Sequence, residues 1–345
     1  MSPAIHMIIF SSLATGTIIT MSSFHWLMAW VGLEINTLSI IPIITTPHHP
    51  RSTEAAMKYF LTQAAASSMI LFSSMTNAWY TGTWDITQLS YTPSVIMLTA
   101  ALSMKLGLAP LHYWLPEVLQ GSTLPTAFII VTWQKLAPMS LIYLTINSLN
   151  TTTLLVMGLL SAVIGGWGGL NQTQTRKIMA YSSISHLGWM ATISSIMTNI
   201  MIMNLVVYLI MTTALFYSLI LFKSKTIQDT ASTWTTSPTL IMAMMLSLLS
   251  LGGLPPLTGF APKWLIMEEL VTQNLTPMAT TMALSALLSL FFYLRLAYTT
   301  ALTLAPNTTP AKFKWRLKQT TSTTIATAST TIAVLFLPLV PLVLL

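Results

Sequence analysis

Four charged residues lie deep inside hydrophobic stretches, where lipid penalises an ionised group. Glu34 falls in WVGLEINTLS, Lys105 in SMKLGLAPLHYWLPE, Lys135 in TWQKLAP and Lys263 in GGLPPLTGFAPKW. A charge at the bilayer centre costs about 2.5–3.5 kcal/mol on insertion scales, so these side chains must face protein, water or a partner. Lysine and glutamate can bind and release protons. The pattern therefore favours proton transfer, and a structural ion pair that fixes helix packing is the alternative.

Two of the lysines adjoin helix breakers. Gly107 and Pro110 follow Lys105, and the sequence GGLPP precedes Lys263. A helix break frees backbone groups, which attract water. Desolvation favours a neutral amine, whereas a neighbouring carboxylate favours the ammonium. We expect Glu34 to pair with Lys105, an attraction of about 4 kcal/mol at 4 Å and an effective dielectric of 20, and so to control its proton.

Two histidines also lie inside predicted membrane spans. His112 follows the first break, and His186 falls in SSISHLGWM. Each is a candidate proton relay, with a hydrogen-bonded packing histidine as the alternative. The chain has no cysteine, which excludes disulfides, thiolate zinc sites and Cys-ligated iron–sulfur clusters. We predict no metal site and no cofactor-binding residue.

The elements that carry these residues are hydrophobic enough to cross a bilayer. Hydrophobic residues make up 54% of the 345 residues and charged residues 6%, and the mean hydropathy is +0.72. Soluble domains carry roughly a quarter charged residues. We predict an all-α polytopic membrane protein with about eleven transmembrane helices. Their approximate ranges are 4–21, 25–45, 55–77, 93–115, 123–146, 150–170, 177–195, 200–222, 238–266, 275–300 and 322–344.

Lysine and arginine are distributed unequally between the predicted loops. The loops on the side of the N-terminus hold nine of the fourteen basic residues, and the loops on the other side hold none. This asymmetry places the N-terminus on the cytoplasm-equivalent side and the C-terminus opposite. The basic residues are scattered rather than striped, which argues against nucleic-acid binding. The nine are Arg51, Arg176, Lys177, Lys223, Lys225, Lys312, Lys314, Arg316 and Lys318.

Similar charges recur at a nearly constant spacing. Lys105 and Lys263 are 158 residues apart, and Lys135 and Arg295 are 160 apart. This spacing predicts one membrane domain, 1–345, made of two five-helix repeats, 1–147 and 148–301, followed by a loop and a C-terminal helix, 302–345. An odd number of helices inverts the second repeat. Paired discontinuous helices in inverted repeats are typical of transporter cores.

Six stretches give the sequence a specific resemblance that covers essentially the whole chain. It resembles the chain 2 family of NADH–ubiquinone oxidoreductase, mitochondrially encoded antiporter-like membrane subunits of respiratory complex I. The stretches are WVGLEINTLSIIPI, EAAMKYFLTQAAAS, KLGLAPLHYWLPEVLQG, TWQKLAP, GGWGGLNQTQTRKIMAYSSISHLGWM and LSLGGLPPLTGFAPKW.

The resemblance implies a function for the buried charges. Glu34 matches the family's key buried glutamate, Lys105 the lysine of the first broken helix, Lys135 the connecting lysine and Lys263 the charge of the second broken helix. It implies a non-redox subunit of an H⁺-translocating NADH:ubiquinone reductase, which moves protons from the matrix to the intermembrane space. A stand-alone cation/proton antiporter and a purely structural membrane subunit are the alternatives.

The resemblance also implies a cellular setting. The subunit would lie in the mitochondrial inner membrane with its N-terminus in the matrix and its C-terminus in the intermembrane space. Its expected partners are membrane lipids, accessory subunits and other complex I membrane subunits, with chains 4 and 4L beside it. It would bind no cofactor itself, because NADH, FMN, the iron–sulfur clusters and ubiquinone are used elsewhere in the complex.

Overall fold

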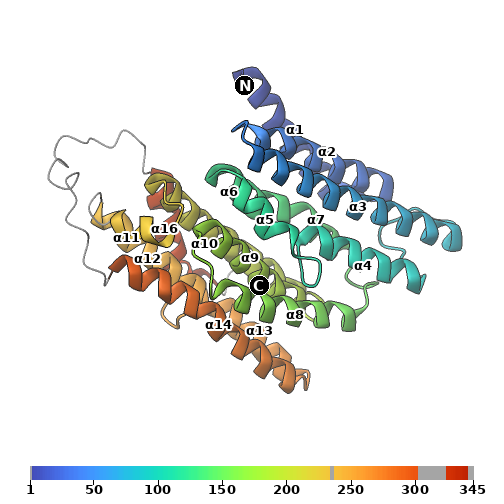
Figure 1. The fold of residues 1–345 in the computed structure, drawn as a ribbon. Helices are drawn as coiled ribbons and strands as arrows, with labels where there is room; N and C mark the ends of the chain where they lie inside the picture. The colour runs from blue at the N-terminus through green and yellow to red at the C-terminus, as the bar shows by residue number, and fades with distance from the viewer. Residues whose placement is uncertain (1, 234–236, 302–323, 341–345) are drawn as a thin grey trace. The chain divides into compact units, whose positions relative to one another are not determined.

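The protein is built from helices throughout the part of the chain that can be described. A computed structural model describes residues 2–233, 237–301 and 324–340, and every regular element within these ranges is a helix (Figure 1). The predicted all-α class is confirmed. The predicted loop at 302–323, with Lys312, Lys314, Arg316 and Lys318, lies outside the described residues.

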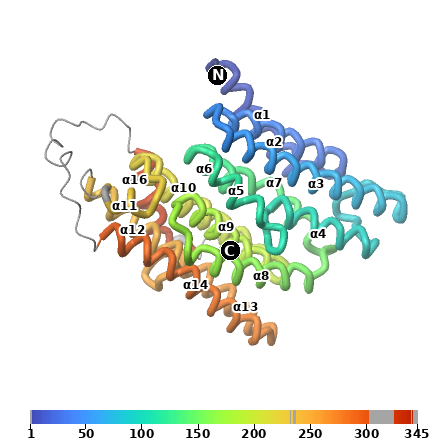
Figure 2. The backbone as a smooth tube through the Cα atoms, viewed as in Figure 1, coloured from blue at the N-terminus to red at the C-terminus, as the bar shows by residue number. Residues whose placement is uncertain are grey.

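Contacts divide the chain into two compact units. The first comprises residues 1–161 and 191–198, and the second comprises 162–190 and 199–345. In the first unit α1, α2 and α3 run side by side, as Figure 2 shows, and α3 also contacts α4 and α5. In the second unit α14 contacts α11, α12 and α13.

The helices have the following bounds. They are α1 (Pro3–Ser22), α2 (Trp26–Thr45), α3 (Pro50–Thr81), α4 (Thr92–Leu106), α5 (Trp114–Gly121), α6 (Leu124–Val131), the 3₁₀ turn η1 (Trp133–Lys135), α7 (Leu136–Thr145), α8 (Thr151–Gly169), α9 (Thr175–Ser194), α10 (Thr198–Phe222), α11 (Ile227–Ser232), α12 (Pro238–Gly252), α13 (Phe260–Thr272), α14 (Thr276–Ala301), α16 (Thr324–Leu335) and η4 (Leu337–Leu339).

Several helices have the length and composition of membrane spans. Among the described residues, six helical segments are long and apolar enough to cross a bilayer: α1, α2, Leu124–Thr145, α8, α10 and α14. The helices α4, α12 and α16 are apolar but shorter. The helices α3 and α9 have 32 and 20 residues, which is sufficient length, but they are less apolar. A multi-pass membrane protein is thus confirmed, whereas the count of eleven spans stays a prediction.

The fourth and ninth predicted spans are both interrupted, as the sequence indicated. The first break separates α4 from α5, and the second separates α12 from α13. Each N-terminal half ends at a left-handed glycine, Gly107 with φ +79° and Gly253 with φ +83°. Glycine has no Cβ and adopts this conformation without steric cost, so it is the residue that ends a helix most easily.

Each unit also contains one short backbone bridge between two of its loops. In the first unit His25 pairs with Asp85, just before α2 begins, and in the second Gln174 pairs with Thr226, just before α9 begins. Each bridge consists of two N–H···O=C bonds of 3.0–3.1 Å. Paired loops must lie on the same side of a membrane, so the two helices between them, α2 and α3 or α9 and α10, cross it an even number of times.

Two glycines allow α1 and α2 to approach closely. A Cβ atom built on Gly32 would lie 2.9 Å from the backbone oxygen of Gly16, and a Cβ built on Gly16 would lie 2.9 Å from that of Gly32. Real Cβ atoms do not come this close to a carbonyl oxygen. Small residues at a helix contact are characteristic of membrane proteins, in which packing rather than hydrophobicity holds helices together.

We predict that Gly32→Val destabilises the first unit. The added side chain must push α1 and α2 apart, and such overpacking typically costs about 1–3 kcal/mol. Thermal unfolding of the purified protein in detergent measures the effect. Val31→Ile, which adds one methylene at an exposed position of the same helix, is the control. Equal melting temperatures for the two variants would contradict the close contact.

Candidate functional site

The first helix break exposes backbone carbonyls that the fold then satisfies. Gly107 and Leu108 both donate their N–H groups to Ser103 O, at 2.8 and 2.9 Å, and so close the end of α4. The indole Nε1 of Trp114, at the start of α5, donates to Met104 O at 3.0 Å. The side chain of Lys135 donates to Leu106 O. Donors from three places therefore converge on the last turn of α4.

Lys135 reaches this carbonyl from an interruption that the sequence analysis did not predict. The fifth predicted span is divided into α6 and α7 by a 3₁₀ turn that ends at Lys135. The cause is Pro138, which has no N–H to donate to Gln134 O and whose ring clashes with that carbonyl. Lys135 is 2% exposed, and its Nζ lies 5.4 Å from the ring centroid of Trp114. Pro138, three residues after Lys135, was the feature of the sequence that could have predicted this interruption.

Lys105, in the last turn of α4, borders a cavity. Its side chain is 4% exposed, and its Nζ has no hydrogen-bond partner among the described residues. The cavity is small, with about 10 Å³ open to the centre of a water-sized sphere, which is room for about one water molecule. Six of its lining residues carry polar atoms in their side chains besides Lys105: Asn36, Thr37, Tyr59, Gln63, Trp114 and Gln134.

The expected ion pair between Glu34 and Lys105 is not formed. No carboxylate oxygen lies within 4.0 Å of Lys105 Nζ, since the two ion pairs in the described part of the chain both belong to Lys58. Glu34 instead accepts a hydrogen bond from Thr37 Oγ1, one turn along α2, at 3.0 Å. Its charge is close enough to act on Lys105 electrostatically. Local bonding within α2 has displaced the direct pair.

The second unit contains a similar arrangement around Lys263. This lysine is 7% exposed and lies in the first turn of α13. Its Nζ donates to Gly252 O at 2.9 Å and to Leu251 O at 3.3 Å, the last carbonyls of α12. The side chain passes close to Gly253, where an added Cβ would lie 2.9 Å from Lys263 Cδ. The second break is thus also closed by a buried ammonium group.

The register that the sequence suggested for the two breaks is wrong. Lys105 precedes its capping glycine, Gly107, by two residues, whereas Lys263 follows Gly253 by ten. The two lysines therefore occupy opposite halves of their broken helices. The residue whose role resembles that of Lys263 is Lys135, because both donate to the end of the preceding half-helix. The spacing between the lysines in the sequence could not show which half of a broken helix each lysine occupies.

The two histidines lie in different surroundings. His112 is buried at the first break, with its ring 4.3 Å from that of Tyr113, and it does not line the cavity beside Lys105. His186, on α9, is buried with Tyr208 and Tyr293: the Tyr293 hydroxyl lies 3.5 Å from His186 Nε2. Lys263 is within electrostatic reach of His186. His186 therefore belongs to a polar cluster in the second unit.

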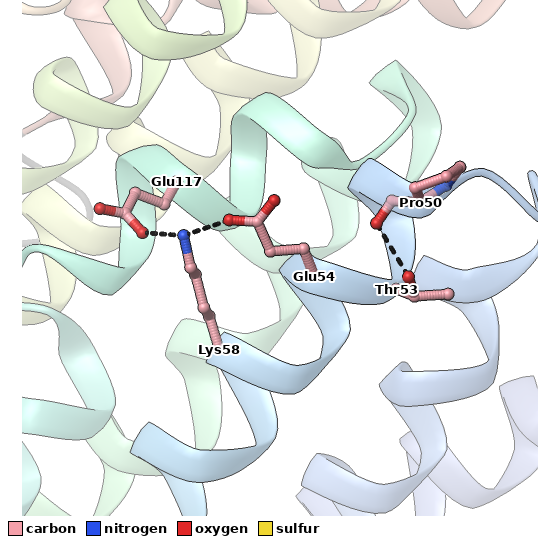
Figure 3. A network of polar contacts seen from close by, with 5 residues as sticks. All are labelled: Pro50, Thr53, Glu54, Lys58 and Glu117. Atoms are coloured by element: carbon pink, nitrogen blue, oxygen red, sulfur yellow. Dashed lines mark hydrogen bonds and ion pairs between the residues drawn. The ribbon is translucent and has the colours of Figure 1, made fainter.

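The other basic residues near span ends have structural partners. Lys58 on α3 lies between two carboxylates, 2.6 Å from Glu54 and 2.7 Å from Glu117 of α5 (Figure 3). The three side chains are 42%, 62% and 52% exposed, respectively. Arg295 on α14 donates to Leu170 O at 2.9 Å. These contacts make Lys58 a peripheral, structural residue.

The uncharged polar residues of the cavity were missed in the sequence analysis. Asn36 and Gln63 each lie inside a predicted membrane span, in LEINTLS and FLTQAAA, and both are buried. Amides inside a membrane protein are costly unless they are hydrogen-bonded, so their position was a signal comparable to that of the lysines. Among the described residues, no group of three or more His, Asp or Glu side chains is placed to hold a metal ion.

Trp114 supports the break through two separate contacts, which two variants can distinguish. Trp114→Phe removes the hydrogen bond to Met104 O but keeps an aromatic ring beneath Lys135, and we expect it to cost about 1 kcal/mol. Trp114→Leu removes both contacts and leaves part of the indole volume empty, so we expect a larger loss, about 3 kcal/mol. Thermal unfolding of the purified protein compares them; equal losses would contradict a contribution from the ring.

Comparisons with known proteins agree with the resemblance drawn from the sequence. The model of the NADH:quinone oxidoreductase/Mrp antiporter transmembrane region matches residues 23–289, and that of the NADH dehydrogenase subunit 2 C-terminus matches residues 290–344. The NADH-ubiquinone oxidoreductase chain 2 of Varanus timorensis is 55% identical over 342 residues, 99% of each chain.

Solved structures share the fold. A chain of respiratory complex I from Thermus thermophilus superimposes with a TM-score of 0.83 at 26% identity, covering 96% of this chain and 77% of that one. A chain of the Mrp complex from Dietzia sp. DQ12-45-1b gives 0.84 at 17% identity, covering 96% and 74%. The predicted family is confirmed: the chain belongs to the NADH-ubiquinone oxidoreductase chain 2 family, the antiporter-like membrane subunits of respiratory complex I.

Proposed function

We propose that this chain moves protons from the mitochondrial matrix to the intermembrane space, coupled to electron transfer in other subunits of the complex. The observation that carries the proposal is the burial of three lysines, Lys105, Lys135 and Lys263, each at most 7% exposed and each at an interrupted helix. Such charges are expensive in a membrane and typically belong to ion or proton pathways. Proton translocation is the general function of this family.

The proposed path uses the buried residues in sequence. Protons pass from the region of Glu34 through Lys105 and Lys135 and then to Lys263, with Glu34 setting the charge of Lys105. Support in the first unit comes from the polar cavity beside Lys105 and from the contact of Lys135 with the end of α4. Support in the second unit comes from the contact of Lys263 with the end of α12.

We propose both histidines as proton relays, and their contacts favour His186 over His112. His186 is buried beside the Tyr293 hydroxyl and within electrostatic reach of Lys263, which favours a role in the second unit. His112 lies at the first break but away from the cavity lining. A packing role is therefore the stronger alternative for His112.

We further propose that the chain crosses the mitochondrial inner membrane eleven times, with the N-terminus in the matrix and the C-terminus in the intermembrane space. The loop asymmetry of lysine and arginine supports this orientation. The repeats 1–147 and 148–301 are supported by the recurrence of a loop bridge and of a glycine-capped break in each unit. An inverted arrangement also explains why the basic residues flank only one of the two bridges, at Arg176, Lys223 and Lys225.

The proposed partners are other membrane subunits of complex I, with chains 4 and 4L adjacent, together with accessory subunits and membrane lipids. The chain itself is proposed to bind no cofactor, with NADH, FMN, the iron–sulfur clusters and ubiquinone used elsewhere in the complex. Identity of 55% to a chain 2 subunit, against 17% to an Mrp complex chain, favours this assignment over a stand-alone antiporter.

Lys105→Met tests the proposed function directly. We expect NADH-driven proton ejection to fall about tenfold or more, because a residue that transfers protons typically contributes at least that factor. The measurement is protons ejected per NADH oxidised, and the turnover, in assembled complex reconstituted into vesicles. Lys58→Met is the matched control: it removes an exposed, ion-paired lysine from the same unit, and we expect near-normal pumping.

Assembly must be measured separately, by the yield of intact complex on a native gel. If Lys105→Met assembles fully and pumps normally, the lysine is structural and the proposed path is wrong. Co-migration of the chain with NADH dehydrogenase activity on the same gel distinguishes a complex I subunit from a stand-alone antiporter.

Lys263 provides a second test, because its positive charge can be kept while its ability to release a proton is removed. Lys263→Arg keeps a cation that can donate to Gly252 O and Leu251 O, but arginine does not release its proton. We therefore expect both Lys263→Arg and Lys263→Met to lose proton ejection in assembled complex. Normal pumping by the arginine variant would show that Lys263 serves only to cap α12.

A further inference from the structure

The cavity beside Lys105 is bordered by buried polar atoms that lack partners. Lys105 Nζ, Gln63 Nε2 and both the Nδ2 and Oδ1 atoms of Asn36 form no hydrogen bond with any residue that the structure describes, and each of these side chains is at most 4% exposed. They come from three helices, α4, α3 and α2. Buried polar groups in native proteins are nearly always hydrogen-bonded to protein or to ordered water. All three side chains line one small space, which points to a ligand that bonds to their unpartnered groups.

The chemistry of these atoms selects water as that ligand. The ammonium of Lys105 and the amide of Gln63 offer donors, which excludes a bound cation. Thr37 also lines the cavity, and its hydroxyl already donates its one proton to Glu34, so it can only accept a further bond, and an anion has no proton to give it. A water molecule can accept from Lys105 and Gln63 and donate to Thr37, which gives it three partners, within the two to four that buried water requires. The size of the cavity matches one such molecule.

Thr37 connects this space to Glu34. Thr37 lines the cavity, and its hydroxyl proton is shared between two oxygens of Glu34, the main-chain O at 2.9 Å and the carboxylate Oε2 at 3.0 Å. A hydroxyl that donates its proton still has lone pairs that accept another. A proton of the cavity water can therefore go to Thr37 Oγ1. This completes a chain from Lys105 to Glu34 in a structure where the two side chains form no ion pair.

We propose that Thr37, with one ordered water held by Gln63, carries protons between Lys105 and Glu34. In one transfer Lys105 Nζ gives a proton to the water, the water gives one to Thr37 Oγ1, and Thr37 gives its hydroxyl proton to the Glu34 carboxylate. The ammonium becomes an amine and the carboxylate becomes a carboxylic acid, while the water and the hydroxyl are regenerated. The reverse transfer restores both charges. Thr37 is thus a further residue of the path, and this assignment rests on the proposed function.

The first test is structural. A cryo-EM map of the assembled complex that is sharp enough to resolve ordered water should contain a density peak about 2.7–3.2 Å from both Lys105 Nζ and Gln63 Nε2. Absence of such a peak at a resolution that shows other buried waters would overturn the proposal.

The second test uses substitutions of Thr37. Thr37→Val keeps the shape and loses the hydroxyl, and we expect proton-coupled NADH turnover in assembled complex to fall about tenfold, the effect of one lost catalytic hydrogen bond. Thr37→Ser retains the hydroxyl and should restore turnover. The matched control is Thr45→Val on the same helix, since the Thr45 hydroxyl bonds only to the main-chain oxygens of Ile41 and Pro42. Normal turnover of Thr37→Val would overturn the proposal.

Lys105→Met separates this proposal from the one on which it rests. If Lys105→Met pumps normally, the proposed function itself fails. If Lys105→Met loses pumping while Thr37→Val does not, the lysine acts in the path and only the bridge to Glu34 is wrong. Loss of pumping in both, with rescue by Thr37→Ser and a resolved water, supports the full chain from Lys105 to Glu34.

Discussion

Backbone carbonyls at the end of a helix need hydrogen-bond donors, and inside a membrane the surrounding lipid supplies none. The two glycine-capped breaks in the described part of the chain meet that requirement with a buried lysine: Lys135 donates to the end of α4, and Lys263 to the end of α12. The charge that lipid would penalise is therefore the group that makes each break tolerable. A break and its lysine support each other, because neither would be stable alone in a hydrophobic environment.

Lys105 differs from these two lysines because its nitrogen has no protein partner. A capping lysine is held in place by the carbonyls that it satisfies, whereas Lys105 borders a space lined by amide and hydroxyl side chains. Hydrogen bonds to carbonyl oxygens favour the ammonium form, so the two kinds of lysine differ in how firmly they hold a proton. The first unit thus combines a lysine bonded to the backbone, Lys135, with one, Lys105, whose nitrogen has no partner among the described residues.

Much of the fold could be predicted from the sequence, because hydrophobic runs and helix breakers carry strong signals. The positions of both breaks follow from Gly107 and Gly253, and the family from motifs around the buried charges. The prediction of a direct ion pair between Glu34 and Lys105 was wrong, because the hydroxyl of Thr37, one turn away, bonds to the carboxylate instead. Long-range pairing depends on side-chain geometry that spacing does not encode. The same limit explains the misaligned repeat and the overlooked amides of the cavity.

The ion pair between Lys58 and Glu117 helps to place a short helix. The helix α5 is only 8 residues long, and it is fastened twice: Trp114 bonds to the end of α4, and one turn later Glu117 pairs with Lys58 of α3. Two bonds to different helices define the orientation of a short helix as well as its position, so α5 is placed by α3 and α4. Because the side chains of Lys58 and Glu117 are both exposed, the bond of the buried Trp114 is the stronger of the two.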